Sequence, residues 1–130
     1  MSPVSPASPV PGEPSRLHHL ALRVADPLRS ARFYGALLGL RELAVHHGPD
    51  GVRAVWLALG ESVLMLEHSL RPPGATHGSA HVLVLACDDL AAAEQRLAAA
   101  GVPVLDRTEF TLYFHDPDGH RVGLSAYRFA

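Results

Sequence analysis

The sequence predicts an α+β fold built from two similar βαβββ modules, and three observations lead to that prediction. A stretch of 25 residues that starts at His19 is repeated without a gap from His81, so the offset is 81 − 19 = 62 residues. Each copy contains an apolar strand-like segment, an aspartate, and a helical segment that ends at a glycine. Short apolar segments separated by turn residues follow in each half, as in strands joined by hairpins. Two copies are too few for a solenoid, so we expect two halves related by a pseudo-twofold axis.

The first half begins with a strand over residues 17–24 and continues with a helix. Asp26 has N-cap chemistry and Pro27 suits the first helical position. The helix is expected to reach about Leu38, where Gly39 can adopt the left-handed conformation of a C-cap.

Three strands complete the first half, and turn residues separate them. The expected strands lie at residues 40–46, 53–59 and 63–67. The GPDG sequence at 48–51 and the pair at 60–61 supply the turns, and RPPGATHGS at 71–79 is a loop.

The second half repeats this order. We expect a strand at 81–86, a helix capped by Asp88 or Asp89, and a helix end at Gly101. Three more strands are expected near 102–105, 111–114 and 121–126, with the turn DPDG at 116–119 before the last one. The chain is thus divided into an arm (1–15), a first module (16–78) and a second module (79–130), with 16–130 forming one domain.

Length and composition exclude several classes of protein. The 130 residues suffice for one domain, and a net charge of −2 without a basic stripe argues against nucleic acid as a partner. No apolar run approaches the roughly 20 residues of a membrane helix. The single cysteine, Cys87, excludes an intrachain disulfide and a CxxC zinc site, and fits a cytoplasmic location. The five prolines of residues 1–15 predict an extended arm.

Strand alternation sorts the side chains onto two faces of each sheet. One face is apolar and is expected to pack beneath the helices: Leu20, Leu22, Val24, Val55, Leu57, Leu59, Leu64, Leu66, Val82, Val84, Ala86, Leu112, Phe114, Val122 and Leu124. The opposite face is chemically mixed: His19, Arg23, Trp56, Met65, Glu67, His81, Thr111, Tyr113, His115, Arg121, Gly123 and Ser125. A mixed concave face is a reasonable site for a small molecule. The alternative is a partly solvated second face, which is common in antiparallel sheets.

Four segments together resemble the vicinal oxygen chelate superfamily of glyoxalases, fosfomycin-resistance enzymes, extradiol dioxygenases and bleomycin-resistance proteins. They are LHHLALRVAD, SARFYGALLGL, AHVLVLACDDL and YFHDPDGHRVGL, and they span most of residues 17–127. The resemblance implies two βαβββ modules that form a curled mixed sheet around a cavity, with the helices on the outer face. It also implies that modules pair within one chain or across a homodimer.

The resemblance further implies metal-ligand positions on the first and last strands of each module. The first-strand positions match His19 and His81, whereas Met65 and Gly123 stand where metal-binding relatives often have glutamate. A catalytic metal needs three protein ligands, so Glu67, about 6–7 Å further along the strand than Met65, is the replacement candidate. The cofactor is then zinc, nickel, manganese or iron, or there is none. A packed or hydrogen-bonded structural role is the alternative for either histidine.

Five other residues are candidates for ligand binding. Thr111 and Tyr113 resemble the anion-contacting hydroxyls of fosfomycin-resistance enzymes. Trp56 and Met65 offer a soft apolar surface for an aromatic ligand, and Arg121 can neutralise an anion. Simple filling of the core is the alternative for the large side chains.

Two functions from different classes follow. The first is a glyoxalase/bleomycin-resistance-like protein that handles a small molecule. In its enzyme form, a divalent metal on His19, His81 and Glu67 would act as a Lewis acid in lyase, isomerase or dioxygenase chemistry, with Glu67 the candidate catalytic residue. The second is a metal-free protein that sequesters a drug-like or metabolite ligand through Trp56, Met65 and Tyr113. A homodimer is expected because each open sheet edge and cavity needs a partner surface.

Overall fold

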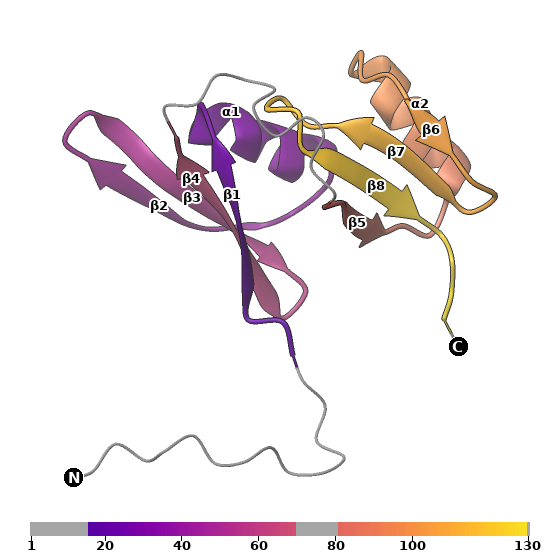
Figure 1. Cartoon of the computed structure of the whole chain (residues 1–130), viewed down its shortest axis with the longest axis horizontal. Coiled ribbons are helices and arrows are strands. Elements are labelled where there is room, and N and C mark those ends of the chain that lie inside the picture. Colours follow the sequence, from indigo (N-terminus) through magenta and orange to yellow (C-terminus); the bar gives the residue numbers. More distant parts are fainter. Residues whose placement is uncertain (1–15, 70–80, 130) are drawn as a thin grey trace, which may run out of the picture.

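The computed structural model describes residues 16–69 and 81–129 and contains two βαβββ modules (Figure 1). The first module comprises β1 (His19–Val24), α1 (Pro27–Ala31) with its continuation η1 (Arg32–Leu37), β2 (Glu42–Gly48), β3 (Gly51–Leu59) and β4 (Ser62–His68). The second comprises β5 (Leu83–Ala86), α2 (Leu90–Ala99), β6 (Asp106–Arg107), β7 (Thr111–His115) and β8 (Arg121–Ser125). The predicted α+β class and element order are confirmed. The predicted arm (1–15) and linker (71–79) lie outside the described residues.

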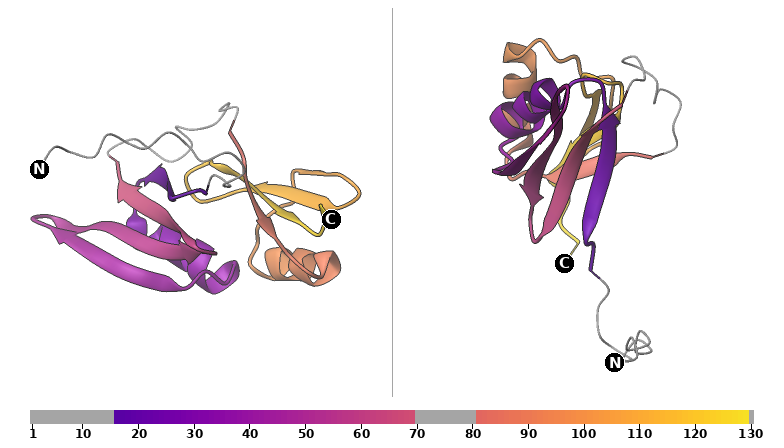
Figure 2. Two further views of the ribbon diagram at one scale, coloured as in Figure 1. Left: turned by 90° about the horizontal axis from the view of Figure 1, so that it is seen from below. Right: turned by 90° about the vertical axis from the view of Figure 1, so that its left-hand side faces the viewer.

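Each module is one four-stranded mixed sheet with a helical segment on one face. The strand orders are β1-β4-β3-β2 and β5-β8-β7-β6, and the first strand of each module pairs in parallel with its last strand. Figure 2 shows the helices of both modules on one side of the molecule and the open faces of both sheets on the other. Among the described residues, no helix has the length and apolar character that a membrane crossing requires.

Both helices start at an aspartate and end at a glycine, as the sequence predicts. The Asp26 side chain accepts hydrogen bonds from the backbone N–H groups of Leu28 and Arg29, at 3.1 and 3.3 Å. In the second module the cap is Asp89 rather than Asp88, and it accepts from the N–H of Ala92 at 3.0 Å. Gly39 and Gly101 have φ angles of 83° and 73°, the left-handed region that a C-cap requires.

The two modules differ by one residue within this shared pattern. The caps Asp26 and Asp89 are 89 − 26 = 63 residues apart, whereas Gly39 and Gly101 are 101 − 39 = 62 apart. The first module therefore holds one more residue between cap and glycine. Its helix contains the π-helical segment η1, and a π-helical turn accommodates an extra residue. The ungapped repeat, with its offset of 62 residues, consequently aligns β1 with β5 one residue away from their structural match.

This shift makes one face prediction wrong. Leu83 and Leu85 of β5 pack against the core, while Val82 and Val84 are 45% and 42% exposed. Val82, Val84 and Ala86 were expected to pack beneath the helix, because the repeat aligned them with the buried side of β1. In the structure the helix cap is Asp89, one residue later than the repeat places it. The buried side of β5 is shifted by the same one residue.

The strand predicted at residues 102–105 is also wrong. Regular pairing in this region is confined to β6, where Asp106 lies opposite Tyr113 and Arg107 opposite Leu112. Val102 and Val104 are partly buried against the core, and Pro103 between them has no N–H to donate. Residues 102–104 therefore pack through their side chains, and bonding to β7 begins at Leu105, whose N–H donates to the carbonyl of Tyr113 at 2.8 Å.

The core continues from one module into the other. Phe33 of η1 and Phe114 of β7 lie with ring centroids 6.1 Å apart. One cluster of buried side chains includes residues of both modules: Val24, Tyr34, Val55, Leu57, Leu64, Leu66, Ala93, Leu97, Leu112, Phe114, Val122 and Leu124. The modules thus share one hydrophobic core.

The DPDG turn between β7 and β8 docks onto the start of the first module's helix. Asp118 is 4% exposed, and it accepts hydrogen bonds from the N–H of Ala25 at 2.8 Å and the hydroxyl of Ser30 at 3.2 Å. Arg29 Nη2 lies 3.5 Å from the same carboxylate. A buried carboxylate is stable only with such partners, so the turn holds the two modules together.

Asp116 makes the second half of this contact. Its carboxylate accepts from the hydroxyl of the fully buried Tyr34 at 2.7 Å and from the N–H groups of Asp118 and His120. Burial raises the pKa of Tyr34 well above its usual value of 10.0, and the charge of Asp116 raises it further. Tyr34 therefore stays a neutral donor across the ordinary pH range.

Replacing Tyr34 with phenylalanine tests the strength of this contact. The change removes a donor from a buried carboxylate, so we expect Tyr34→Phe to lower the free energy of unfolding by about 1–3 kcal/mol. Urea denaturation at pH 7 measures the difference, and Tyr127→Phe is the control because Tyr127 is 54% exposed.

The same variant has an expected pH signature. Since the fold raises the pKa of Tyr34, the unfolded chain loses this proton first, at a pH near the ordinary value of 10.0. The stabilising contribution of neutral Tyr34 is complete below that pH and decreases above it. The parent protein should therefore lose stability more steeply above pH 10 than Tyr34→Phe does. Equal unfolding free energies for parent and variant at pH 7 would contradict the assigned contact.

Candidate functional site

The open faces of the two sheets are arranged in rows of neighbours across the strands. Strand pairing places four residues of the first module side by side in what we call the central row: Ala21, Met65, Trp56 and Ala44. The corresponding row of the second module contains Val84, Gly123 and Tyr113. Trp56 and Tyr113 therefore occupy matching places, each opposite the last strand of its module, and give each open face one large aromatic side chain.

The ring of Tyr113 covers Gly123. A Cβ atom built on Gly123 would lie 3.2 Å from two ring carbons of Tyr113 and 3.2 Å from the carbonyl oxygen of Leu112. Such contacts are closer than ordinary van der Waals packing, so a larger side chain there requires the ring to move. The guanidinium of Arg121 lies 4.6 Å from the centre of the same ring, and Arg121 Nη2 is 3.4 Å from Asp106. Tyr113 thus fills the place where the resemblance implies a metal-binding glutamate.

The two candidate histidines do not occupy equivalent positions. His19 is exposed on β1, with its Nδ1 2.9 Å from Nδ1 of His18. His81 is exposed and precedes β5, which starts at Leu83. With the offset of 63 residues that the strand pairing gives, the counterpart of His19 is Val82. The equivalence expected from the sequence repeat is therefore wrong.

The donor atoms present do not fit a three-ligand metal site within one chain. In residues 16–69 and 81–129, no three His, Cys, Asp or Glu side chains gather closely enough to hold an ion. Met65 brings only a thioether to the central row, and Gly123 brings no donor. Glu67 lies on β4 opposite Arg23 and Ala54. The ligand set His19, His81 and Glu67 stays a prediction.

Thr111 is buried in the second sheet and hydrogen-bonded to a neighbouring strand. Its hydroxyl donates to the hydroxyl of Ser125 at 2.7 Å, and the residue is 7% exposed. Tyr113, two residues along β7, is less buried and makes the ring contact with Arg121. Of the two hydroxyl residues predicted to contact a ligand, Tyr113 is therefore the more accessible.

His46 is a residue of the open face that the sequence analysis did not single out. Its ring centroid lies 4.3 Å from that of Trp56, with an angle of 55° between the rings. His46 Nε2 and Trp56 Nε1 are both buried and lack a hydrogen-bond partner among the described residues. Burying a polar group unpaired costs about 1–3 kcal/mol. The alternation of residues 40–46 could have placed His46 on this face, but only the pairing with β3 shows its neighbour.

A pocket of about 370 Å³ is formed by side chains of β1, β3 and β4 in the first module. Arg23, Arg53, Glu67 and His68 line it. Its volume falls within the range of small-molecule sites. Its lining combines two cations with one carboxylate, so it favours a ligand that carries negative charge.

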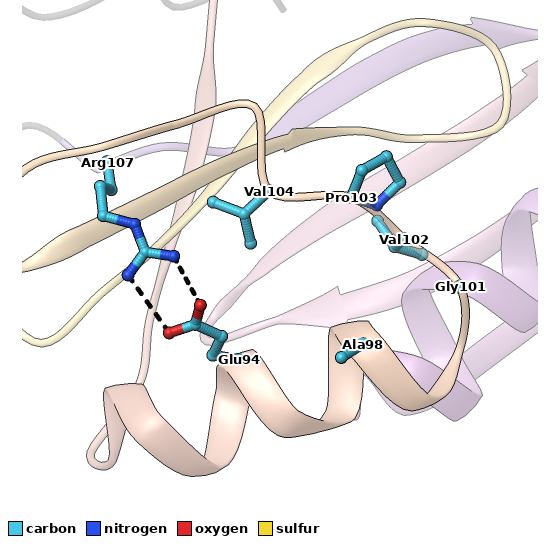
Figure 3. A pocket seen from close by; sticks show the side chains of 7 residues that line it. All are labelled: Glu94, Ala98, Gly101, Val102, Pro103, Val104 and Arg107. Atoms are coloured by element: carbon cyan, nitrogen blue, oxygen red, sulfur yellow. Dashed lines mark hydrogen bonds and ion pairs between the residues drawn. The ribbon is translucent and has the colours of Figure 1, made fainter.

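A second hollow lies away from the open faces, between α2 and the segment that leads into β6 (Figure 3). Its volume is about 530 Å³, and it is lined by Glu94, Ala98, Gly101, Val102, Pro103, Val104 and Arg107. Arg107 donates to both carboxylate oxygens of Glu94, and this hydrogen bonding lowers the pKa of Glu94. The polar groups of this hollow are therefore already paired with each other.

Comparison with known proteins places these features in context. The family model described as Glyoxalase/Bleomycin resistance protein/Dioxygenase superfamily matches residues 16–124. The glutathione transferase FosA of Serratia marcescens is 30% identical over 115 residues, which cover 83% of this chain and 78% of that protein.

Two solved structures illustrate the range of the fold. The fosfomycin resistance protein FosX of Mesorhizobium loti aligns with a TM-score of 0.74 at 18% identity, covering 90% of this chain and 95% of FosX. TnmS3, an antibiotic binding protein of a Streptomyces species, aligns with a TM-score of 0.62 at 28% identity, covering 85% and 94%. At 18% identity the first likeness shows the fold alone, and proteins of this fold include both resistance and binding proteins.

Proposed function

Because the chain belongs to the Glyoxalase/Bleomycin resistance protein/Dioxygenase superfamily, we propose that it binds a small molecule on its open sheet faces without a metal. In this function it sequesters a drug-like or metabolite ligand. The observation that carries the proposal is the Tyr113 ring over Gly123, because it fills the place of a carboxylate ligand with an aromatic surface.

The contact surface suits an aromatic ligand. Trp56 and Met65 are neighbours in the central row and only partly buried, so a planar molecule can contact both. On the second sheet, Tyr113 and Arg121 form a stacked pair that offers a ring face and a positive charge. The likeness to TnmS3, itself an antibiotic binding protein, supports a binding function.

Metal content in solution tests this proposal. We expect tag-free protein, loaded in turn with zinc, nickel, manganese and iron and then desalted, to retain far less than one ion per chain. A three-ligand site is incomplete with two histidines, and incomplete sites bind weakly. Elemental mass spectrometry measures the content of the parent, His19→Ala and His81→Ala. His47→Ala is the control, because His47 is an exposed histidine on β2. A near-stoichiometric ion that both site variants lose and the control keeps would overturn the proposal.

The second candidate is a metal-assisted enzyme with lyase, isomerase or dioxygenase chemistry. The observation that favours it is the 30% identity to the glutathione transferase FosA. For this candidate the ligands would be His19, His81 and Glu67, brought together by two chains. Glutathione-dependent consumption of fosfomycin by metal-loaded protein, lost in Glu67→Gln, would support it over the binding protein.

We also propose that two chains pair through their open faces. Val84 of β5 and Val82 just before it are 42% and 45% exposed, and Ala21 of β1 and Ala86 of β5 are exposed as well. Apolar residues on an uncovered sheet with free edge strands favour association. A second copy would cover these residues and enclose the bound ligand.

Sedimentation at a series of concentrations tests the pairing. We expect a species of twice the chain mass of 13.9 kDa, and we expect Val84→Asp to shift it to the monomer because a charge would face the partner. Leu28→Asp is the matched control, since Leu28 is 44% exposed but lies on the helix side. A parent protein that sediments only as a 13.9 kDa species would exclude the dimer.

A further inference from the structure

The open face of the first sheet changes from apolar to charged between two neighbouring rows. Beside the central row of Ala21, Met65, Trp56 and Ala44, strand pairing forms a second row, which we call the charged row: Arg23, Glu67, Ala54 and His46. Rows on the same face are about 6–7 Å apart along the strands. A ligand of ordinary size therefore contacts both rows at once.

Arg23 and Glu67 of the charged row also line the 370 Å³ pocket, together with Arg53 and His68. Arg53 and His68 alternate with Ala54 and Glu67 along β3 and β4, so the pocket collects side chains from both faces at this end of the sheet. Among the described residues, Arg23, Arg53 and Glu67 take part in no ion pair. The two guanidinium groups outnumber the single carboxylate, so the pocket attracts an anion. Glu67 accepts hydrogen bonds only, so it suits a donor group next to that anion.

Unpaired ring nitrogens lie where the two rows meet. Trp56 belongs to the central row and His46 to the charged row, and their rings lie 4.3 Å apart. Trp56 Nε1 can only donate, and it has no acceptor among the described residues. Apart from the His46 ring, its neighbours in the two rows are the methyl groups of Ala44 and Ala54 and the thioether of Met65. A ligand oxygen reached by a small turn of the rings would supply the missing acceptor.

From these rows we infer that the ligand is a planar aromatic acid with a hydrogen-bond donor beside its acid group. The aromatic body lies over Trp56 and Met65, and the acid group binds Arg23 and Arg53 in the pocket. The donor group faces Glu67. This inference rests on the proposed binding function and names the class of ligand for the same face.

Two fluorescent dyes separate the aromatic body from the acid group. Both 8-anilinonaphthalene-1-sulfonate and N-phenyl-1-naphthylamine contain the same rings and the same N–H, but only the first carries an acid group. We expect the full chain to bind the sulfonate dye about tenfold more tightly than the neutral dye, because guanidinium–anion hydrogen bonds are the strong ones. Fluorescence titration measures both dissociation constants.

Variants assign the difference to the pocket. Arg23→Gln and Arg53→Gln should each weaken the sulfonate dye about fivefold and leave the neutral dye unchanged, because only the first dye has the anion. Trp56→Ala should weaken both dyes, since both place their rings on the central row. Arg128→Gln is the charge-matched control, because Arg128 is 78% exposed near the C-terminal end of the described chain. Cooperative thermal unfolding confirms that each variant is folded.

The outcomes distinguish this inference from the proposed function. Equal affinities for the two dyes, or arginine variants that bind like the parent, would overturn the acid-group assignment while Trp56→Ala still supports binding on the sheet. If Trp56→Ala leaves both dyes unaffected, or neither dye binds, the inference fails together with the proposed use of this face.

Discussion

The docking of the DPDG turn onto the helix of the first module is the contact on which the rest of the structure depends. Two buried carboxylates, Asp116 and Asp118, reach across from the second module to Tyr34, Ser30 and the N–H of Ala25. Buried carboxylates without partners would be strongly destabilising, so these groups determine one relative placement of the modules. That placement unites the core, puts both helices on one side, and leaves both open sheet faces on the other (Figure 2).

The open faces then differ in chemistry although they share a topology. On the first face an apolar central row adjoins a charged row and a pocket. On the second, the ring of Tyr113 lies over Gly123 and under Arg121. The ring can lie there because Gly123 has no side chain. Within one chain, the described residues gather no set of metal ligands, and the open faces present aromatic side chains instead. These two observations support the proposal of binding over metal-assisted chemistry.

Much of the fold could be predicted from local chemistry in the sequence. Asp26 with Pro27, Gly39 and Gly101 mark the helix ends, and alternation identifies the open-face residues of β3, β4, β7 and β8. The repeat predicts the wrong buried side for β5. The first module holds one extra residue in η1, so the spacing between the modules is 63 residues before the helices and 62 after them. His46 was missed because the sequence does not give the register of the β2–β3 hairpin, which sets its neighbours. The pocket at Arg53 was missed because it also takes Arg23 from the distant strand β1. No local pattern reports such contacts.

The most direct test of the account is a double-mutant cycle between Gly123 and Tyr113, measured by urea denaturation. A methyl group at Gly123 would press on both the Tyr113 ring and the Leu112 carbonyl, so Gly123→Ala should cost about 1–3 kcal/mol in the parent. In the Tyr113→Ala background the ring contact is gone and only the carbonyl contact remains, so the cost should fall by about 1 kcal/mol. Additive effects of the two changes would contradict the claim that the ring occupies the ligand position.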